Sequence, residues 1–271
     1  MTASAIVLAA GEGTRMRSPL PKVLHQVAGR PLLAHVLALV AHLDPRPAPV
    51  VVVLGRGAAA VREAVAPAVA DLAGLCFAVQ TERRGTAHAV QQAAPLAAGR
   101  ADAVLVLYGD VPLLRPGSVE RLLACHAERR PAASLLSAVV ADPRGYGRVI
   151  RRGGPAGEVI RIVEEVDATA AEGAVREING GVYVFDDAWL WPALDGLTPA
   201  PSGEVYLTDL VDRAVAAGRQ VRALAVEDPD EVAGVNTPAE LARADRILRR
   251  RHAETATPGA LGRAAPRGGA R

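Results

Sequence analysis

A glycine-rich loop near the N-terminus follows a short apolar run. Residues 5–10 are typical of a buried strand; Gly11-Glu12-Gly13-Thr14-Arg15-Met16 follows them, and Lys22 comes shortly after. Glycines let backbone N–H groups approach an anion closely, and a loop at the carboxyl end of a strand faces the ligand crevice of an open α/β sheet. This pattern indicates phosphate binding. The spacing matches neither a Walker loop nor a dinucleotide fingerprint, so a plain tight turn is an equal alternative on the pattern alone.

The amino-acid usage of the chain draws attention to Lys22. Of the 31 basic residues one is lysine and 30 are arginine, and asparagine occurs only as Asn179 and Asn236. A compact, mobile ammonium in a chain that otherwise uses arginine indicates a geometry that the planar guanidinium cannot meet; one chance surviving surface lysine is the alternative. Tyrosine is scarce as well and occurs only as Tyr108, Tyr146, Tyr183 and Tyr206. The positions of all these scarce residues therefore indicate where a functional site could lie.

A carboxylate follows a second apolar run. Residues 103–108 are typical of a buried strand and lead into Gly109-Asp110-Val111-Pro112. An oxygen ligand at this edge of a sheet suits Mg²⁺, which commonly takes one or two carboxylates together with substrate phosphates. A turn or helix-capping aspartate before the proline is the alternative, and the local sequence favours neither.

The elements that would position these residues alternate along the first half of the chain. Short apolar runs separated by helical periodicity are typical of βαβ units, which build a mainly parallel sheet with helices on both faces. We expect strands at 5–10, 50–54, 75–80 and 103–108, and helices at 31–43, 58–70, 86–97 and 116–129. From about residue 133 we expect a small mixed β lobe with extended segments at 134–141, 147–151, 158–164 and 181–185, then a helix at 206–217, a strand at 221–226 and a helix at 238–251.

Composition excludes several classes of protein. The chain is 50% hydrophobic and 22% charged with a net charge of +2, which argues against disorder and against a general nucleic-acid binder. Its longest apolar stretch, 31–43, is interrupted by His35 and His42 and is too short to span a membrane. No basic residue precedes the first apolar run, so we expect a cytoplasmic protein without a signal peptide. Cys76 and Cys125 lie far apart with no histidine at metal-ligand spacing, and we expect both to be small core residues.

Two segments of the N-terminal region resemble a known family. L-A-A-G-E-G-T-R-M at 8–16 and P-K-V-L at 21–24 resemble the signature of sugar-1-phosphate nucleotidylyltransferases, and within them are most similar to the uridylyltransferase domain of bacterial N-acetylglucosamine-1-phosphate uridylyltransferases. The likeness extends over about residues 5–250. It implies a Rossmann-like nucleotidyltransferase fold for residues 1–251, with a nucleotide-binding half at about 1–132 and a sugar-binding half with closing helices at 133–251.

The resemblance assigns roles around the nucleotide. Arg15 and Lys22 would neutralise its phosphates and serve as the catalytic residues. Y-G-D-V-P-L at 108–113 is similar to the family's second motif, in which the aspartate, here Asp110, binds the catalytic Mg²⁺. Its family partner is the asparagine of G-V-N, here Asn236, which could also cap the last helix. Other nucleotide contacts implied by the resemblance are Leu8, Ala9, Ala10, Gly11, Gly13, Gln80, Gly85, Thr86 and Tyr108.

Among these contacts, Gln80 and Thr86 also have roles that the residues alone would favour. A glutamine amide with backbone groups can match the edge of uracil, which places an N3–H donor between two carbonyl acceptors. Q-T-E-R-R-G-T-A-H-A at 80–89 is similar to the uridine-reading segment of the family. Taken singly, Gln80 as a solvated strand end and Thr86 as a helix N-cap are the more ordinary roles. His88 is on a helix surface, and we assign it no function.

Motifs in the second half resemble the sugar-binding motifs of the family, and they imply Gly147, Glu164 and Asn179 as sugar contacts. Carboxylate and amide groups can satisfy sugar hydroxyls and an acetamido group. Two positions depart from the family: Val166 stands where a lysine is common, and Gly180 where threonine or serine is common. G-E-V-Y-L-T-D at 203–209 is similar to a further motif that shapes the sugar pocket.

The function implied is transfer of a uridylyl group from UTP to N-acetylglucosamine 1-phosphate, with Mg²⁺ as cofactor and small molecules as the only partners. The same chemistry on another pair, such as glucose 1-phosphate, dTTP or GTP, and a non-catalytic nucleotide-sugar-binding subunit stay open as alternatives. The bifunctional relatives continue into a left-handed β-helix that acetylates glucosamine 1-phosphate and forms trimers. Here we expect residues 252–271 to form a flexible tail, no acetyltransferase activity and an open oligomeric state.

Overall fold

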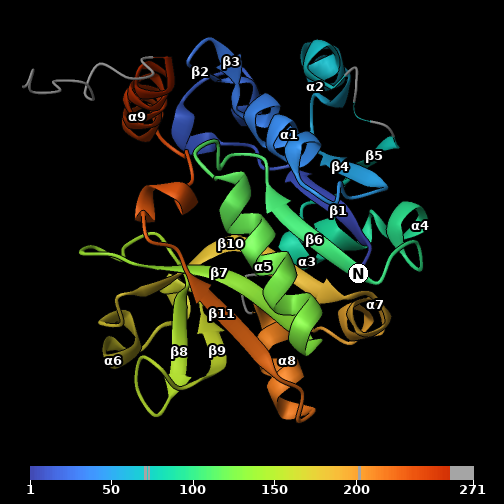
Figure 1. The fold of residues 1–271 in the computed structure, drawn as a ribbon, viewed down its shortest axis with the longest axis vertical. Helices are drawn as coiled ribbons and strands as arrows, with labels where there is room; N and C mark the ends of the chain where they lie inside the picture. Colours follow the sequence, from blue (N-terminus) through green and yellow to red (C-terminus); the bar gives the residue numbers. More distant parts are fainter. Residues whose placement is uncertain (70–71, 73, 201–202, 257–271) are drawn as a thin grey trace, which may run out of the picture.

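The chain folds around one mixed sheet. The computed structural model describes residues 1–69, 72, 74–200 and 203–256 (Figure 1). Within that part, nine strands join in the main sheet and two short strands form a hairpin. The strands of the main sheet are β1 (Ala3–Ala9), β4 (Val50–Leu54), β5 (Leu75–Val79), β6 (Ala103–Tyr108), β7 (Ala133–Val139), β8 (Arg148–Arg152), β9 (Glu158–Val163), β10 (Glu177–Asp186) and β11 (Val221–Ala225). The hairpin consists of β2 (Gln26–Val27) and β3 (Arg30–Pro31).

The direction of the strands confirms the expected α/β class. The strand order is β11-β7-β10-β6-β1-β4-β5, and β1 is parallel to both β4 and β6. Along this path, for the residues that the structure describes, only β10 runs against its neighbours, because it pairs antiparallel with both β6 and β7. β8 and β9 branch off β10 as an antiparallel pair and form the expected small lobe.

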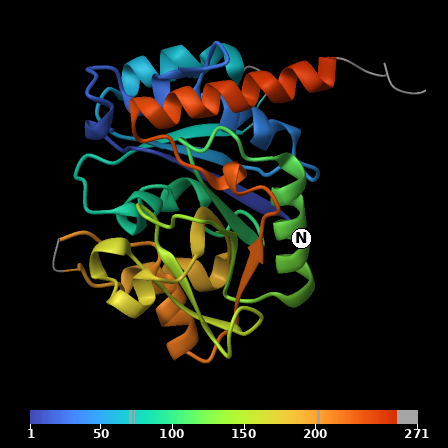
Figure 2. The ribbon, with the colours of Figure 1, turned by 90° about the vertical axis from the view of Figure 1, so that its left-hand side faces the viewer.

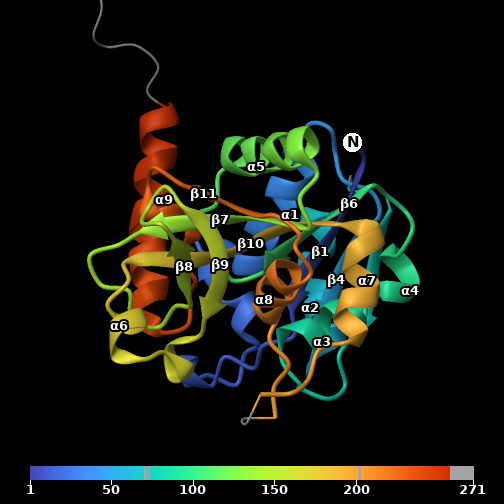
Figure 3. The same ribbon diagram turned by 90° about the horizontal axis from the view of Figure 1, so that it is seen from below.

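Helices cover both faces of the sheet. One face packs against α1 (Leu32–His42), α2 (Ala58–Val65) and α5 (Pro116–Arg129). The other packs against α3 (Thr86–Gln91), α4 (Ala94–Ala97), α7 (Asp187–Asp195) and α8 (Asp209–Ala216). Figure 3 shows α5 on one side of the sheet and α7 and α8 on the other. Because successive residues of a strand face opposite ways, Val7 enters the first core and Ile6 the second.

The last helix, α9 (Pro238–Ala256), packs apart from both faces. It forms a third apolar cluster with the β2 hairpin, the start of α1 and two loop residues, Leu113 and Val235. Figure 2 shows α9, in red, alongside the blue N-terminal part of the chain. Residues 252–256 continue this helix, so the expectation that the tail begins at 252 is wrong for these five residues. Residues 257–271 lie outside the described part.

Several other expectations need correction. Helix 86–97 is divided into α3 and α4, with Pro95 at the start of α4, and 58–70 is α2 followed by a 3-10 turn, Ala66–Ala68. Helix α7 was not expected; the side chain of Asp186 caps it by accepting the Trp189 N–H, and Pro192 lies inside it. A short helix, α6 (Ala170–Gly173), lies between β9 and β10.

The two cysteines lie in the expected elements, Cys76 in β5 and Cys125 in α5. Cys76 is partly buried and packs against the second core, close to what was expected, whereas Cys125 is only partly buried. Among the described helices, none combines the length and the apolar character needed to cross a bilayer.

Buried His126 gives the fold a pH dependence. Its ring is 2% exposed and its Nδ1 lies 3.0 Å from Ser134 Oγ, and burial lowers the His126 pKa to about 4. The unfolded chain then binds the extra proton more readily, so stability falls as pH drops from the unfolded pKa of about 6.5 towards 4. Between pH 7 and pH 5, we expect the free energy of unfolding to fall by about 1–2 kcal/mol less in His126→Gln than in the wild type, measured by urea unfolding. His42→Gln, at an exposed position of α1, is the control, and an equal loss in wild type and His126→Gln would contradict this origin.

Candidate functional site

A cavity of about 290 Å³ opens at the carboxyl ends of the parallel strands. β1, β5 and β6 all end at this edge, so the loops after them meet there. Ten residues predicted from sequence line it: Leu8, Ala9, Ala10, Gly11, Lys22, Gln80, Gly85, Thr86, Tyr108 and Asp110. The structure thus brings together residues from three separate motifs.

Lys22 lies at the centre of the polar contacts in this cavity. Its ammonium donates hydrogen bonds to Asp110 Oδ2 and, at 2.9 Å, to Asn236 Oδ1. The side chains of Lys22 and Asp110 are 11% and 15% exposed, so the ion pair is largely shielded from water. A carboxylate and an amide oxygen from opposite halves of the chain therefore converge on one cation.

The start of α9 explains why Asn236 is available. The Thr237 hydroxyl accepts the Glu240 N–H at 3.2 Å, and the Glu240 carboxylate accepts the Thr237 N–H at 2.9 Å. This is a capping box, which satisfies the helix end without the Asn236 side chain. The expectation that Asn236 could cap the helix is wrong; Thr237 does so, and the oxygen of Asn236 is left to Lys22.

The glycine-rich loop holds the stem of Lys22 in place. Gly13 has a φ of 65°, and a Cβ there would lie 2.5 Å from Lys22 Cβ, so the loop backbone passes directly over the lysine. Neither Gly13 nor Arg15 lines the cavity, and Arg15 is exposed in the 3-10 turn Thr14–Met16. Their predicted contacts with a nucleotide stay predictions.

Gln80 and Thr86 are tied into the fold rather than left at its surface. Gln80 is 6% exposed, and its Nε2 donates to Gly85 O at 3.1 Å and lies 3.0 Å from His88 Nδ1. The ordinary alternative of a solvated strand end is therefore excluded. Thr86 follows the N-cap residue Gly85, and its hydroxyl accepts the N–H of Leu207 at 2.9 Å, so it is not the helix cap. This bond joins the cavity wall to the second half of the chain.

Gly85 is required by its backbone conformation. It has φ 95° and ψ −179°, which is accessible essentially to glycine alone, and a Cβ would lie 2.4 Å from Val205 O. We expect Gly85→Ala to lower the free energy of unfolding by about 2–4 kcal/mol, measured by urea denaturation. Gly11→Ala is the matched control, because no atom lies within 4 Å of a Cβ there. Equal stability of the two variants would contradict the steric argument.

The predicted sugar contacts form a second cluster. A Cβ on Gly147 would lie 3.4 Å from Glu164 Oε2 and 3.6 Å from Asn179 Cβ, so these three residues are neighbours. The Thr208 hydroxyl donates to Glu164 Oε1 at 2.9 Å. Burial raises the pKa of Glu164, with Asp209 among the nearby carboxylates that add to the effect, while the Thr208 bond opposes it. Thr208 was not named from sequence as a site residue, although it lies in the 203–209 motif.

A chain of side chains links this cluster to the cavity. Asn179 Nδ2 donates to the Tyr183 hydroxyl at 2.5 Å, and the hydroxyls of Tyr183 and Thr86 are close enough to Tyr108 to influence its pKa. Tyr108 lines the cavity and Tyr183 is fully buried. Burial raises the pKa of both tyrosines, so both hydroxyls stay protonated and can donate.

The two departures from the family pattern have different surroundings. Val166 is 81% exposed and projects into solvent. A Cβ on Gly180 would lie 2.8 Å from both Leu136 O and Val232 Cγ1. A threonine or serine at position 180 would therefore displace Val232. Glycine at this position allows β10 to pack closely against the segment that contains Val232.

Five residues line the cavity without having been predicted: Glu12, Val23, Arg83, Ala89 and Glu204. Glu12 and Arg83 form an ion pair at 3.0 Å, which joins the glycine-rich loop to the loop after β5. The signal for these two was present, because opposite charges stand beside predicted contacts in both motifs.

The donor set suits a hard divalent cation. Asp110 and Asn236 supply oxygen atoms, and their convergence on the Lys22 ammonium shows that both face one cation position. Within the described residues, no group of three or more histidine, cysteine, aspartate or glutamate side chains could hold a metal ion. Asp110 and Asn236 would supply two oxygen ligands to a metal in this cavity, and substrate phosphates commonly complete such a shell.

Similar sequences cover almost the whole chain. It is 49% identical over 252 residues to the bifunctional protein GlmU of Pelotomaculum thermopropionicum, covering 93% of this chain and 53% of that protein. The bifunctional protein GlmU of Kineococcus radiotolerans is 49% identical over 242 residues, which covers 89% of this chain and 48% of that protein. The chain thus spans about half the length of these curated relatives.

Solved structures and a family model agree with this picture. An apo UDP-glucose pyrophosphorylase superposes with a TM-score of 0.74 at 15% identity, covering 93% of this chain and 100% of that one. A structure described as a glucose-1-phosphate thymidylyltransferase from Bacillus anthracis gives 0.70 at 20% identity, covering 92% and 96%. These likenesses show the fold alone. The model of the MobA-like NTP transferase domain matches residues 5–181, and the chain therefore belongs to the family of MobA-like NTP transferase domains.

Proposed function

We propose that this chain transfers the uridylyl group of UTP to N-acetylglucosamine 1-phosphate, giving UDP-N-acetylglucosamine and pyrophosphate. The observation that carries the proposal is the convergence of Lys22, Asp110 and Asn236 beside a cavity lined by the glycine-rich loop. Family membership and the motif resemblance at 8–16 and 80–89 support it further.

The reaction needs no protein nucleophile. A phosphate oxygen of the sugar 1-phosphate attacks the α-phosphorus of UTP, a P–O bond forms, and the bond to the β,γ-pyrophosphate breaks, with its electron pair leaving on pyrophosphate. The attacking oxygen is already anionic, so the protein contributes position and charge neutralisation. Holding two reactants in line supplies as much as about 7–11 kcal/mol of the barrier.

Each part of the site has a task in this scheme. Lys22, and Arg15 from the same loop, neutralise negative charge on the departing pyrophosphate. Gln80 reads the uracil edge beside Gly85 and Thr86. In the second lobe, Glu164 and Asn179 bind sugar hydroxyls and the acetamido group, and Gly147 leaves the backbone N–H accessible.

Asp110 and Asn236 are the residues that would hold Mg²⁺. The ion would supply positive charge that neutralises and orients the phosphates of both substrates. The fit rests on the two oxygens that already face one cation. Lys22 donates to both oxygens, so its ammonium fixes their orientation before any substrate binds.

The decisive experiment measures pyrophosphate release from each pairing of UTP, dTTP, GTP and CTP with N-acetylglucosamine 1-phosphate or glucose 1-phosphate, with Mg²⁺ and with excess EDTA. We expect UTP with N-acetylglucosamine 1-phosphate to give the highest kcat/KM, and EDTA to abolish it. A higher kcat/KM for another pairing would change the assigned substrates. UTP binding without turnover on any sugar phosphate would show a nucleotide-sugar-binding protein instead of an enzyme.

A further inference from the structure

Helix α9 reaches the two loops that carry Asp110 and Asn236. Arg251, near the end of this helix, donates from Nη1 to the backbone oxygen of Leu113 at 2.6 Å and from Nη2 to Asp228 Oδ2 at 2.9 Å. Leu113 belongs to the loop after β6, which also contains Asp110. Asp228 begins the segment 228–236, called here the strap, which ends at Asn236. One guanidinium therefore connects both loops without lining the cavity.

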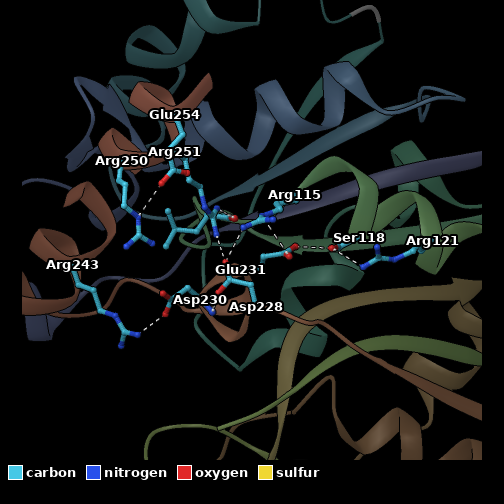
Figure 4. A network of polar contacts seen from close by, with 11 residues as sticks. Arg115, Ser118, Arg121, Asp228, Asp230, Glu231, Arg243, Arg250, Arg251 and Glu254 are labelled. Carbon is cyan, nitrogen blue, oxygen red and sulfur yellow. Dashed lines mark hydrogen bonds and ion pairs between the residues drawn. The ribbon is translucent and has the colours of Figure 1, made fainter. Parts of the chain in front are cut away.

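The strap has further anchors on the opposite side (Figure 4). Asp228 Oδ2 also accepts from Arg115 Nη2 at 2.9 Å, just before α5 begins. Glu231, 3% exposed, accepts the Ser118 hydroxyl at 2.6 Å and lies 3.6 Å from Arg115 Nε. The strap is thus fixed between the first turn of α5 and the end of α9.

Close packing leaves the strap little room to shift. Val232 lies against Gly180 of β10 with no space for a Cβ between them. Val235 and Leu113 are each 1% exposed beneath α9, and the Val235 N–H donates to Asp110 O at 2.9 Å. The two loops therefore touch each other directly next to the two side chains that hold Lys22, and a displacement of either loop is transmitted to that pair.

Arg251 differs from the other arginines of α9. Its side chain is 18% exposed, whereas those of Arg243 and Arg249 are 62% and 64% exposed. Arg243 bonds Asp230 at 2.5 Å on the surface, and Arg249 bonds Asp245 within the helix at 2.6 Å. Neither touches the loop after β6 through these bonds. The planar guanidinium has two terminal nitrogen atoms that can each donate to a different acceptor. Arg251 uses both of them, Nη1 for Leu113 and Nη2 for Asp228.

We propose that Arg251 is a positioning residue, which sets the spacing between Asp110 and Asn236 around Lys22 by joining their two loops. Asp228 is the strap's acceptor in this arrangement. The placement of the three side chains is a property of the protein itself, and only the consequence for turnover rests on the proposed function.

The single lysine makes the placement measurable. Protein grown with ¹³Cε,¹⁵Nζ-lysine, with any lysine-free tag, gives one side-chain signal, because Lys22 is the only lysine in the chain. We expect Arg251→Met and Asp228→Asn to displace or double this signal at constant pH. Arg249→Met, whose printed bond to Asp245 stays within α9, should leave it at the wild-type position. A wild-type signal in both Arg251→Met and Asp228→Asn would overturn the proposal. If Arg251→Met does not fold, the Asp228→Asn signal decides.

Kinetics give a second, independent readout. Arg251 does not line the cavity, so we expect Arg251→Met to lower kcat about tenfold while KM for UTP stays within twofold of wild type. A lowered melting temperature with unchanged kcat and an unchanged lysine signal would show a merely structural role and overturn the proposal. If the wild type has no turnover, the proposed function fails, and the lysine signal still decides the placement of Arg251.

Discussion

Lys22→Ala is expected to lower kcat for pyrophosphate release about 10²–10³-fold, the usual cost of removing one preorganised charge donor from a site of this kind. Lys22 is the group on which Asp110 and Asn236 converge, and it is largely shielded from water, where electrostatic interactions are strong. Steady-state kinetics on the preferred substrate pair measure the effect. Circular dichroism and the melting temperature should show a folded protein.

Two companion variants sharpen this test. Lys22→Arg keeps the charge, but the loop backbone at Gly13 leaves no room around the stem for a different path, so we expect at least about a tenfold loss. Arg17→Ala removes an exposed cation from the adjacent turn and should stay near wild type. Full activity of Lys22→Ala would remove Lys22 from the mechanism, and full activity of Lys22→Arg would show that charge alone suffices.

Asp110→Asn is expected to lower kcat about 10²-fold or more and to raise the Mg²⁺ concentration needed for half-maximal rate. The substitution removes the carboxylate of the oxygen pair while keeping its size, and the backbone bond from the Val235 N–H to Asp110 O survives. A Mg²⁺ titration of initial rates at saturating substrates measures both effects.

The control for this variant is Asp195→Asn, at an exposed position at the end of α7. It removes one carboxylate from the protein without touching the cavity, so its Mg²⁺ titration should match that of the wild type. An Asp110→Asn protein with an unchanged Mg²⁺ requirement would mean that this carboxylate does not hold the metal.

The fold was largely predictable because its first half follows simple patterns. The strand at 103–108 and the helix at 116–129 have the expected bounds, since each apolar run ends at a glycine or proline. Helix α7 was missed because tryptophans and an internal proline disguise its periodicity, and the aspartate that caps it also ends β10. Local patterns cannot show that one residue serves both elements.

The candidate site was predictable where motifs supplied it and not where contacts cross the chain. Lys22 and Asp110 stand out by type and by their place after strands. Thr237 rather than Asn236 caps α9, because Thr237 and Glu240 exchange side-chain-to-backbone hydrogen bonds. These bonds depend on the geometry of the turn, which the sequence pattern does not show. Arg251 carried no signal at all, because it is one arginine among 30 and its acceptors lie far away in sequence.

The antiparallel strand β10 determines how the halves of the chain depend on each other. It lies between β6 and β7, and Tyr183 pairs with Val106 across the boundary expected near 132. A cut at that boundary would leave β6 with an unpaired apolar edge, which is prone to aggregate. The chain should therefore unfold as one cooperative unit and not yield two stable fragments.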